Sequence, residues 1–230
     1  MPTAANQLIE SLPAKDRRGL LKVAESVQLE QSELLGEVGK PTRSIYFPVK
    51  GFISLVTSIA GKPVLEVGMV GCEGMFGAQV CLRVLTQPLH AIVQGSGSAW
   101  RVPVTEFCAQ LERSVPLQHL LGRYVYVLMT QLAAAAACTR FHEIDARLAR
   151  WLLMMQDRAH DHAFGVTHEF LSFMLGVRRV GVTLAAGELQ KAGLIAYRRG
   201  QVSVLDRKGL EKMACSCYCD DRQVYTRIMH

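Results

Sequence analysis

The stretch from Val166 to Leu205 constrains the fold of this chain more than any other part of it. Thr167 is a favourable helix N-cap, apolar residues follow it at one-face helical spacing, and Gly176 can end the helix in a left-handed conformation. A second apolar stripe contains small alanines that let two helix axes cross closely. Two alternating runs joined at Arg199-Gly200 then predict a hairpin. The stretch therefore predicts two short helices followed by a two-stranded wing.

The opposite face of the second predicted helix carries guanidinium groups and hydrogen-bonding side chains instead of a mixture of both charges. A helix, a turn, a helix and a basic wing form a layout that reads duplex DNA, with the second helix in the major groove. The alternative is an amphipathic helix pair in an ordinary bundle, which the wing disfavours. The residues expected to contact DNA are Thr167, Arg178, Arg179, Thr183, Gln190, Arg198 and Arg199.

This stretch resembles the C-terminal winged helix-turn-helix of the Crp/Fnr superfamily of bacterial transcription regulators. The phrases LGVRR, GVT and LQKAGLI carry the resemblance, together with the hairpin after them. Further upstream, YFPVKGFISLV and VGCEGMFG resemble the cyclic-nucleotide-binding β-roll of that superfamily, and the second phrase stands at the place of the phosphate-binding cassette. The resemblance implies a homodimer that binds an inverted repeat in double-stranded DNA, with RNA polymerase as a candidate further partner.

Short apolar runs separated by glycine-containing turns predict an antiparallel roll between Val27 and Val104. We therefore expect an α+β chain with an N-terminal antiparallel, jelly-roll-like β-roll, a long dimerisation helix and a C-terminal winged helix-turn-helix. The expected domains are an effector roll at 1–115, a dimerisation helix at 116–141 and a DNA-binding domain at 142–230. Within the last domain, residues 209–228 are expected to form a single closing helix.

The long helix predicted after Pro116 has a heptad pattern. Its selected positions repeat at alternating spacings of four and three, and the five alanines at 133–137 would let a partner helix approach closely. A helix buried within one subunit is the alternative. The expected dimer seam consists of Leu117, Leu121, Tyr124, Leu128, Gln131, Ala135 and Cys138.

The expected effector pocket departs from the pattern that it resembles. Superfamily members that bind cyclic AMP use a glutamate for the ribose and an arginine-serine pair for the cyclic phosphate. Here Cys72 stands at the glutamate position, and Leu89 and His90 stand at the other two. A half-buried phosphate without a cation loses hydration for little return, so cyclic AMP is an unfavourable ligand and the effector is unknown. The pocket would comprise Gly71, Cys72, Glu73, Gly74, Leu89 and His90.

The predicted recognition helix departs from the superfamily as well. The best-known members carry a glutamate just after the position of Arg179 and an arginine near the middle of the helix, whereas this chain has Val180 and Leu184. Carboxylate recognition of cytosine is therefore excluded, and Val180 is placed to contact a thymine methyl group. The same departures leave a second hypothesis open, in which a ligand-sensing or scaffold dimer has weak or lost sequence-specific DNA binding.

The remaining chemistry of the sequence indicates neither a metal site nor an active site. Seven cysteines in a chain whose N-terminus lacks an apolar leader are expected to be reduced, cytoplasmic thiols. On one continuous helix Cys215 and Cys219 share a face while Cys217 points elsewhere, so we expect inert thiols, no bound metal and no cofactor. The HDH sequence at 160–162 is expected to be a hydrated linker.

Two further classes of protein are disfavoured. A metal-dependent enzyme on a cupin-like roll would need clustered histidine and glutamate ligands, and His90 is the only histidine of the predicted roll. No nucleophile and base motif is found either, so no catalytic residue is expected. The most apolar tract, 124–138, is too short to cross a bilayer, so we expect no membrane partner.

Overall fold

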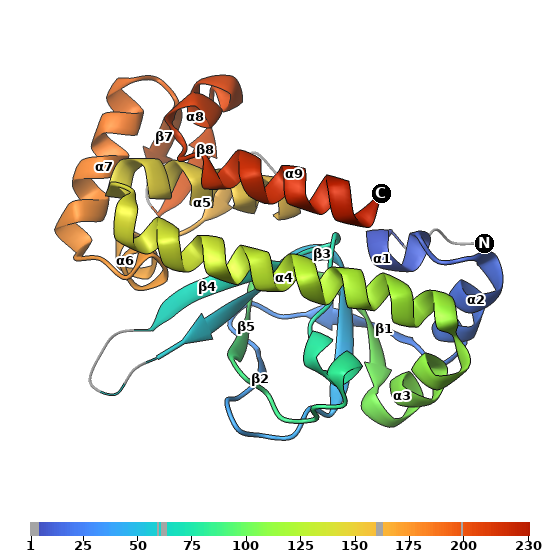
Figure 1. The fold of residues 1–230 in the computed structure, drawn as a ribbon. Helices are drawn as coiled ribbons and strands as arrows, with labels where there is room; N and C mark the ends of the chain where they lie inside the picture. The colour runs from blue at the N-terminus through green and yellow to red at the C-terminus, as the bar shows by residue number, and fades with distance from the viewer. Residues whose placement is uncertain (1–4, 59, 61–63, 160–162, 199) are drawn as a thin grey trace. The chain divides into compact units, whose positions relative to one another are not determined.

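The computed structural model describes residues 5–58, 60, 64–159, 163–198 and 200–230. The chain forms two compact units, one made of Met1–Leu55, Met69–Met129 and Thr226–His230, the other of Val56–Gly68 and Thr130–Tyr225. Figure 1 shows the helices and strands along the chain. Because α4 (Val115–Phe141) belongs to both units, the division at 115 and 141 stays a prediction.

The first unit contains the predicted roll. Its helical elements are α1 (Gln7–Glu10), α2 (Ala14–Lys22), the short 3-10 helix η1 (Ala78–Leu82) and α3 (Val104–Arg113). Its strands are β1 (Glu25–Leu29), β2 (Leu34–Gly36), most of β3 (Ser44–Thr57) and β5 (His90–Pro103), whereas β4 (Leu65–Val70) is divided between the two units at Met69. Among the described residues the strand order is β1-β5-β3-β4, and β2 also pairs with β5. Strands β1 and β2 both run antiparallel to β5, which agrees with the predicted roll.

Aromatic side chains fill the core of this unit. Phe47, Phe52 and Phe107 are among the largest fully buried side chains of the chain. Two glycines allow the long strands β3 and β5 to approach at their bend. A Cβ atom at Gly51, where φ is +77°, would lie 2.1 Å from the carbonyl oxygen of Gly95, so this position tolerates no side chain.

Helix α4 buries the side that the sequence pattern assigned to a second subunit. Leu117, Leu121 and Tyr124 are at most 3% exposed, and Cys138 packs against Cys215 and Cys217 of the same chain. These four α4 residues are therefore reassigned from the dimer seam to the core. The other expected seam residues, Leu128, Gln131 and Ala135, are half-buried.

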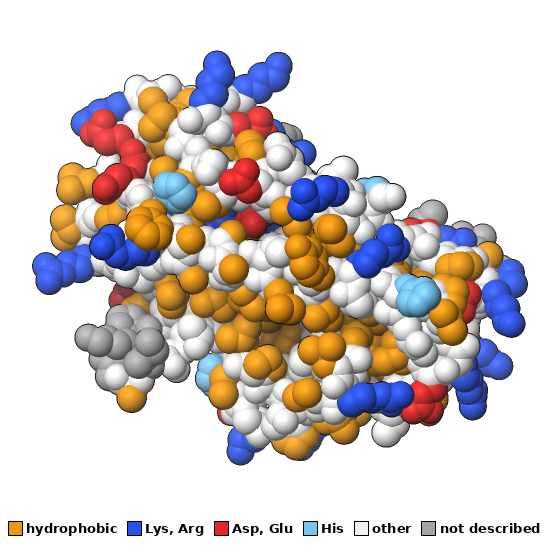
Figure 2. Space-filling model, in the orientation of Figure 1, with side chains coloured by type: hydrophobic (Ala, Val, Ile, Leu, Met, Phe, Trp, Pro, Cys, Tyr) orange, Lys and Arg blue, Asp and Glu red, His pale blue; other side chains and the backbone are white. Residues whose placement is uncertain are grey.

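A second heptad stripe of α4 is exposed instead. Its positions repeat at the same alternating spacings of four and three, which is why the sequence pattern alone could not decide between the two stripes. Figure 2 shows hydrophobic side chains gathered along α4 on the face that it displays. The exposed stripe consists of Val115, His119, Gly122, Tyr126, Met129, Ala133, Ala136 and Arg140.

The continuous helix is longer than the apolar tract considered in the sequence. With 27 residues and a mean hydropathy of 1.3 in its most apolar window, α4 is long and apolar enough to cross a membrane by length and composition. The tract 124–138 was therefore too narrow a basis for excluding a span. Leu117, Leu121 and Tyr124 are buried against protein, but only 22% of the most apolar window is buried.

The second unit contains the predicted winged helix-turn-helix. Its helices are α5 (Ile144–Ala159), α6 (His168–Leu175), α7 (Arg179–Lys191), α8 (Arg207–Met213) and the larger part of α9 (Cys217–Met229). Its strands β6 (Ala163–Gly165), β7 (Ile195–Arg198) and β8 (Gln201–Val204) form an antiparallel sheet in the order β6-β8-β7. Strand β6 was not predicted, and the HDH sequence before it lies outside the described residues.

The expected closing helix is two helices. Helix α8 ends at Met213, Ala214 adopts an extended conformation with ψ 149°, and α9 begins at Cys217. No glycine or proline marks this break, which places Cys215 and Cys217 in the interior while Cys219 stays exposed. The expectation that Cys215 and Cys219 share one face of a continuous helix was therefore wrong.

Candidate nucleic-acid interface

Helices α6 and α7 form the two arms of the predicted helix-turn-helix. Thr167 caps α6 by accepting a hydrogen bond from the Phe170 N–H at 3.1 Å, and Gly176 ends it with φ +63°. The chain direction turns by 108° between the two helices, within the range typical of helix-turn-helix motifs. Buried Val182, Ala185, Ala186 and Leu189 form the inner face of α7, as the sequence pattern predicted. The opposite face of α7 is left open to solvent.

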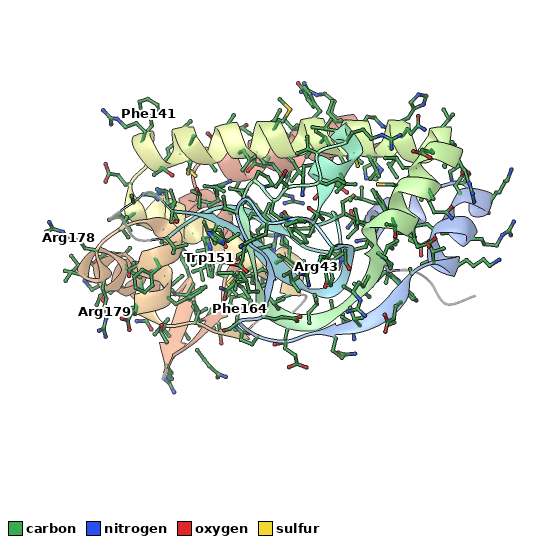
Figure 3. All side chains as sticks on the ribbon, turned by 90° about the horizontal axis from the view of Figure 1, so that it is seen from below. Arg43, Phe141, Trp151, Phe164, Arg178 and Arg179 are labelled. Carbon is green, nitrogen blue, oxygen red and sulfur yellow. The ribbon has the colours of Figure 1, made fainter. Side chains whose placement is uncertain are left out.

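The beginning of α7 presents cationic and apolar side chains together. Arg178 is the N-cap residue and Arg179 the first helical residue, and both are exposed. Their side chains point away from the body of the unit (Figure 3). Val180 and Leu184 are 68% and 67% exposed, so the open face carries two large apolar side chains that no core contact explains. Sequence reasoning identified Val180 as a base contact but did not assign that role to Leu184.

His168 joins α6, α7 and the wing. Its Nδ1 lies 3.0 Å from the Thr183 hydroxyl, and its ring centre lies 4.4 Å from that of Tyr197. Burial lowers the pKa of His168, and the nearby charge of Arg179 lowers it further. Burial and the charge of Arg179 therefore favour the neutral form of the His168 imidazole. Because Thr183 also donates to the Arg179 carbonyl oxygen at 3.1 Å, its hydroxyl helps to position the start of α7.

The wing is fastened to α7 by Gln190. The side-chain carbonyl of Gln190 accepts a hydrogen bond from the Tyr197 N–H at 2.8 Å, which gives this residue a positioning role beside the DNA contact expected for it. Arg198 is exposed at the end of β7, opposite Gln201 of β8. Arg199, which was also expected to contact DNA, lies outside the described residues.

A buried arginine supports the interface from behind and was not found from the sequence. Arg147 of α5 is only 9% exposed, and its guanidinium group donates a hydrogen bond to the carbonyl oxygen of Leu175 at the end of α6. Desolvation lowers the pKa of Arg147. The contact satisfies a carbonyl group that the end of the helix would leave unpaired. It therefore holds α6 where the turn into α7 begins.

Comparisons with known proteins agree with this geometry. Residues 146–213 match the family model described as the Crp-like helix-turn-helix domain, a range that includes α6, α7 and both strands of the hairpin. The Global nitrogen regulator of Synechococcus elongatus is 26% identical over 203 residues, which cover 80% of this chain and 87% of that protein. Residues 146–213 are therefore similar to a Crp-like helix-turn-helix domain, and the chain as a whole is similar to Crp/Fnr transcription regulators.

Solved structures of Crp/Fnr regulators share the fold. One from Eubacterium rectale matches with a TM-score of 0.68 and 15% identity, covering 90% of this chain and 96% of that chain. A second, from Thermus thermophilus, matches with a TM-score of 0.66 and 20% identity over 82% of this chain and 96% of that chain. These likenesses support the α+β architecture of a roll, a long helix and a winged helix-turn-helix.

In this chain, the segment at the place of the phosphate-binding cassette is closed by its own contacts. The Gly71 N–H donates to a Glu73 carboxylate oxygen at 3.2 Å, and the Gly74 N–H donates to the Gly71 carbonyl at 3.0 Å. The Met75 N–H donates to the Tyr124 hydroxyl at 3.0 Å. These N–H groups, which could otherwise bind an anion, already have acceptors within the chain.

The N-terminal helix covers the same segment. The buried Asn6 side chain donates to the Gly74 carbonyl at 2.9 Å, and the Gln7 N–H donates to the Cys72 carbonyl at 2.7 Å. Leu89 and His90 are both half-buried, and β5 begins at His90. The contacts that close the cassette segment thus come from α1 and α4 and from the segment itself.

Proposed function

We propose that the chain is a homodimeric, sequence-specific DNA-binding regulator that acts in the cytoplasm, with the α7 helix of each subunit in a major groove. The exposed start of α7 is the observation that carries this proposal. Arg178 and Arg179 are exposed there, and among the described residues neither forms an ion pair. Exposed guanidinium groups beside exposed apolar side chains match the mixed polar and methyl edges of base pairs.

Each group on this face has a matching partner on duplex DNA. A guanidinium fork fits the O6 and N7 atoms of guanine, and such a contact contributes about 1–3 kcal/mol of discrimination against other bases. Val180 and Leu184 fit thymine methyl groups. Arg198 on the wing and the N-terminus of α6 at Thr167 fit backbone phosphates, which set position and salt dependence.

The exposed stripe of α4 is the proposed contact with a second copy of the chain. Tyr126 and Met129 are 50% and 63% exposed, and the small side chains of Ala133 and Ala136 would let two helices approach closely. A dimer formed in this way would present two α7 helices to half-sites about 34 Å apart, the spacing of one duplex turn. The preferred target is therefore an inverted repeat, and RNA polymerase is the further partner implied by the family.

We also propose that the effector pocket does not bind cyclic AMP. The N–H groups of Gly71, Gly74 and Met75 are already paired, and no arginine stands at the phosphate position that Leu89 occupies in the sequence. An anion placed there would lose hydration without gaining a cation. Regulation by another ligand, instead of catalysis, is consistent with the transcription regulators to which the chain is similar.

The proposal is tested by selecting bound duplexes from a random pool and measuring affinity for the selected duplex and a scrambled one. We expect Arg179→Ala to weaken binding to the selected duplex by about 5- to 150-fold, which corresponds to about 1–3 kcal/mol, with a smaller loss on the scrambled duplex. Arg198→Ala should weaken both alike and lower the salt slope by about one. Equal loss of specificity in both variants would contradict the assignment of base and phosphate contacts.

The second candidate function predicts a different result. A ligand-sensing or scaffold dimer would yield no enriched motif from the pool and would bind both duplexes with the same affinity.

A further inference from the structure

Four potential metal ligands meet in the interior of the second unit, in a place that DNA binding does not use. Cys138 lies near the end of α4 and His142 follows one helical turn later, with its N–H bonded to the Cys138 carbonyl at 3.2 Å. Cys215 lies in the break between α8 and α9, and Cys217 is the first residue of α9. The break in the expected closing helix is what brings Cys215 and Cys217 to the same place.

The ligand atoms have the spacing of a tetrahedral ion site. The four atoms all lie within 4.8 Å of one another. The Sγ atoms of Cys138 and Cys215 are 3.5 Å apart, and Cys217 Sγ lies 3.6 Å from His142 Nδ1. Zinc bonded to sulfur at about 2.3 Å and to nitrogen at about 2.0 Å in a tetrahedron would separate two sulfurs by about 3.8 Å and a sulfur and a nitrogen by about 3.5 Å. These two pairs therefore need to move by only a few tenths of an ångström.

The chemistry and burial of this ligand set favour zinc in a structural role. Three thiolates and one imidazole form one of the usual closed zinc sites, with no position left for water or substrate. Cys138, Cys215 and Cys217 are 2%, 7% and 8% exposed, so the site is shielded from solvent. Thiolate ligands also discriminate against magnesium and calcium, which prefer oxygen.

Cationic groups surround the site and offset its charge. Zinc with three thiolates and a neutral imidazole carries one net negative charge. Arg147 and Arg150 both interact electrostatically with Cys138 and Cys215, and Arg150 also pairs with the Asp221 carboxylate at 2.7 Å. The N-terminus of α9 at Cys217 further favours a thiolate.

We propose that Cys138, His142, Cys215 and Cys217 bind one zinc ion that fastens the end of α4 to the start of α9. The sequence alone had indicated inert thiols because a continuous helix would have turned Cys217 away from Cys215. A two-cysteine redox pair would account for Cys138 and Cys215 but not for the convergence of His142 and Cys217 on them. The inference does not depend on the proposed DNA target.

The test is the metal content of the full chain, purified under reducing conditions without a metal-affinity tag. We expect about one zinc per chain by elemental analysis. Cys215→Ser should lose the metal, whereas Cys219→Ser, which alters an exposed cysteine two residues after Cys217, should retain it. In metal-free protein, added cobalt should give the absorption bands of a tetrahedral thiolate complex.

A further variant distinguishes loss of metal caused by a missing ligand from loss of metal caused by misfolding. His142→Cys keeps four ligands, so it should retain one zinc per chain and intensify the thiolate-to-cobalt absorption. Reduced wild-type protein that contains no zinc and takes up no cobalt would overturn the proposal. So would equal metal loss in Cys219→Ser and Cys215→Ser, or a Cys138–Cys215 disulfide in protein that still binds no metal after reduction. None of these measurements requires DNA binding, so they remain informative if the proposed operator is not found.

Discussion

Replacing Leu184 by alanine tests whether the apolar part of α7 contacts bases. The side chain is 67% exposed in the free protein, so about two thirds of it remains available for burial. Because full burial of a leucine side chain contributes about 1.5–3 kcal/mol, covering the exposed part against thymine methyl groups would contribute about 1–2 kcal/mol. We therefore expect Leu184→Ala to weaken binding to the selected duplex by about 5- to 30-fold.

The stability of the protein should not fall in this variant. Leu184 contributes little to the core, and alanine has the highest helix propensity, so the free energy of unfolding should stay within about 0.5 kcal/mol of the wild type. Leu205→Ala is the matched control, since Leu205 is 63% exposed in the same unit but lies outside α7. This control should bind the selected duplex as the wild type does.

The assay is fluorescence anisotropy on two versions of the selected duplex, one with thymine and one with deoxyuridine at the contacted step. Deoxyuridine lacks only the methyl group, so the wild type should lose affinity on this duplex. The Leu184→Ala variant should lose little more, because the two changes remove the same contact. Binding by Leu184→Ala within about twofold of the wild type, or an equal loss in Leu205→Ala, would refute the assignment.

Three other predictions follow from contacts described above. Because burial lowers the pKa of His168 below its ordinary 6.5, the unfolded chain takes up a proton first and the unfolding free energy should fall as the pH drops below 6.5; denaturant titrations of His168→Asn should lack this part of the pH dependence. Ala133→Glu places a charge in the exposed stripe of α4 and should give monomers in sedimentation velocity, and unchanged dimers would exclude that stripe. Tyr124→Phe leaves the buried Met75 N–H without its acceptor and should lower the unfolding free energy by about 1–3 kcal/mol, a loss that calorimetry would detect.

The parts of the fold that local signals specify could be predicted from the sequence. The hydroxyl of Thr167 and the conformational freedom of Gly176 mark the ends of α6, and the structure places both residues in those roles. The wing follows from two alternating runs around a glycine, and the structure pairs Arg198 with Gln201 there. Short-range periodicity and capping chemistry were sufficient for these elements.

The parts that depend on tertiary packing could not be predicted in this way. Helix α4 carries two heptad stripes, and periodicity does not reveal which of them the same chain buries. The break before Cys217 has no glycine or proline, so Cys138 and Cys215, which lie far apart in the sequence, gave no sign of their contact. The only local signals were the Cys138 and His142 spacing of four residues and the alternation of Cys215 and Cys217.

The attachment of the wing to α7 has a consequence for the DNA itself. Gln190 accepts a hydrogen bond from the Tyr197 N–H, and the ring of Tyr197 lies against His168, so contacts within the chain set the position of the wing relative to α6 and α7. A wing held in this way does not change its position relative to α7 to suit the contour of each operator. We expect the double helix to curve so that it meets both α7 and the wing, and the cost of curving depends on its base steps. Operators should therefore favour easily kinked pyrimidine–purine steps between the positions that protein atoms touch.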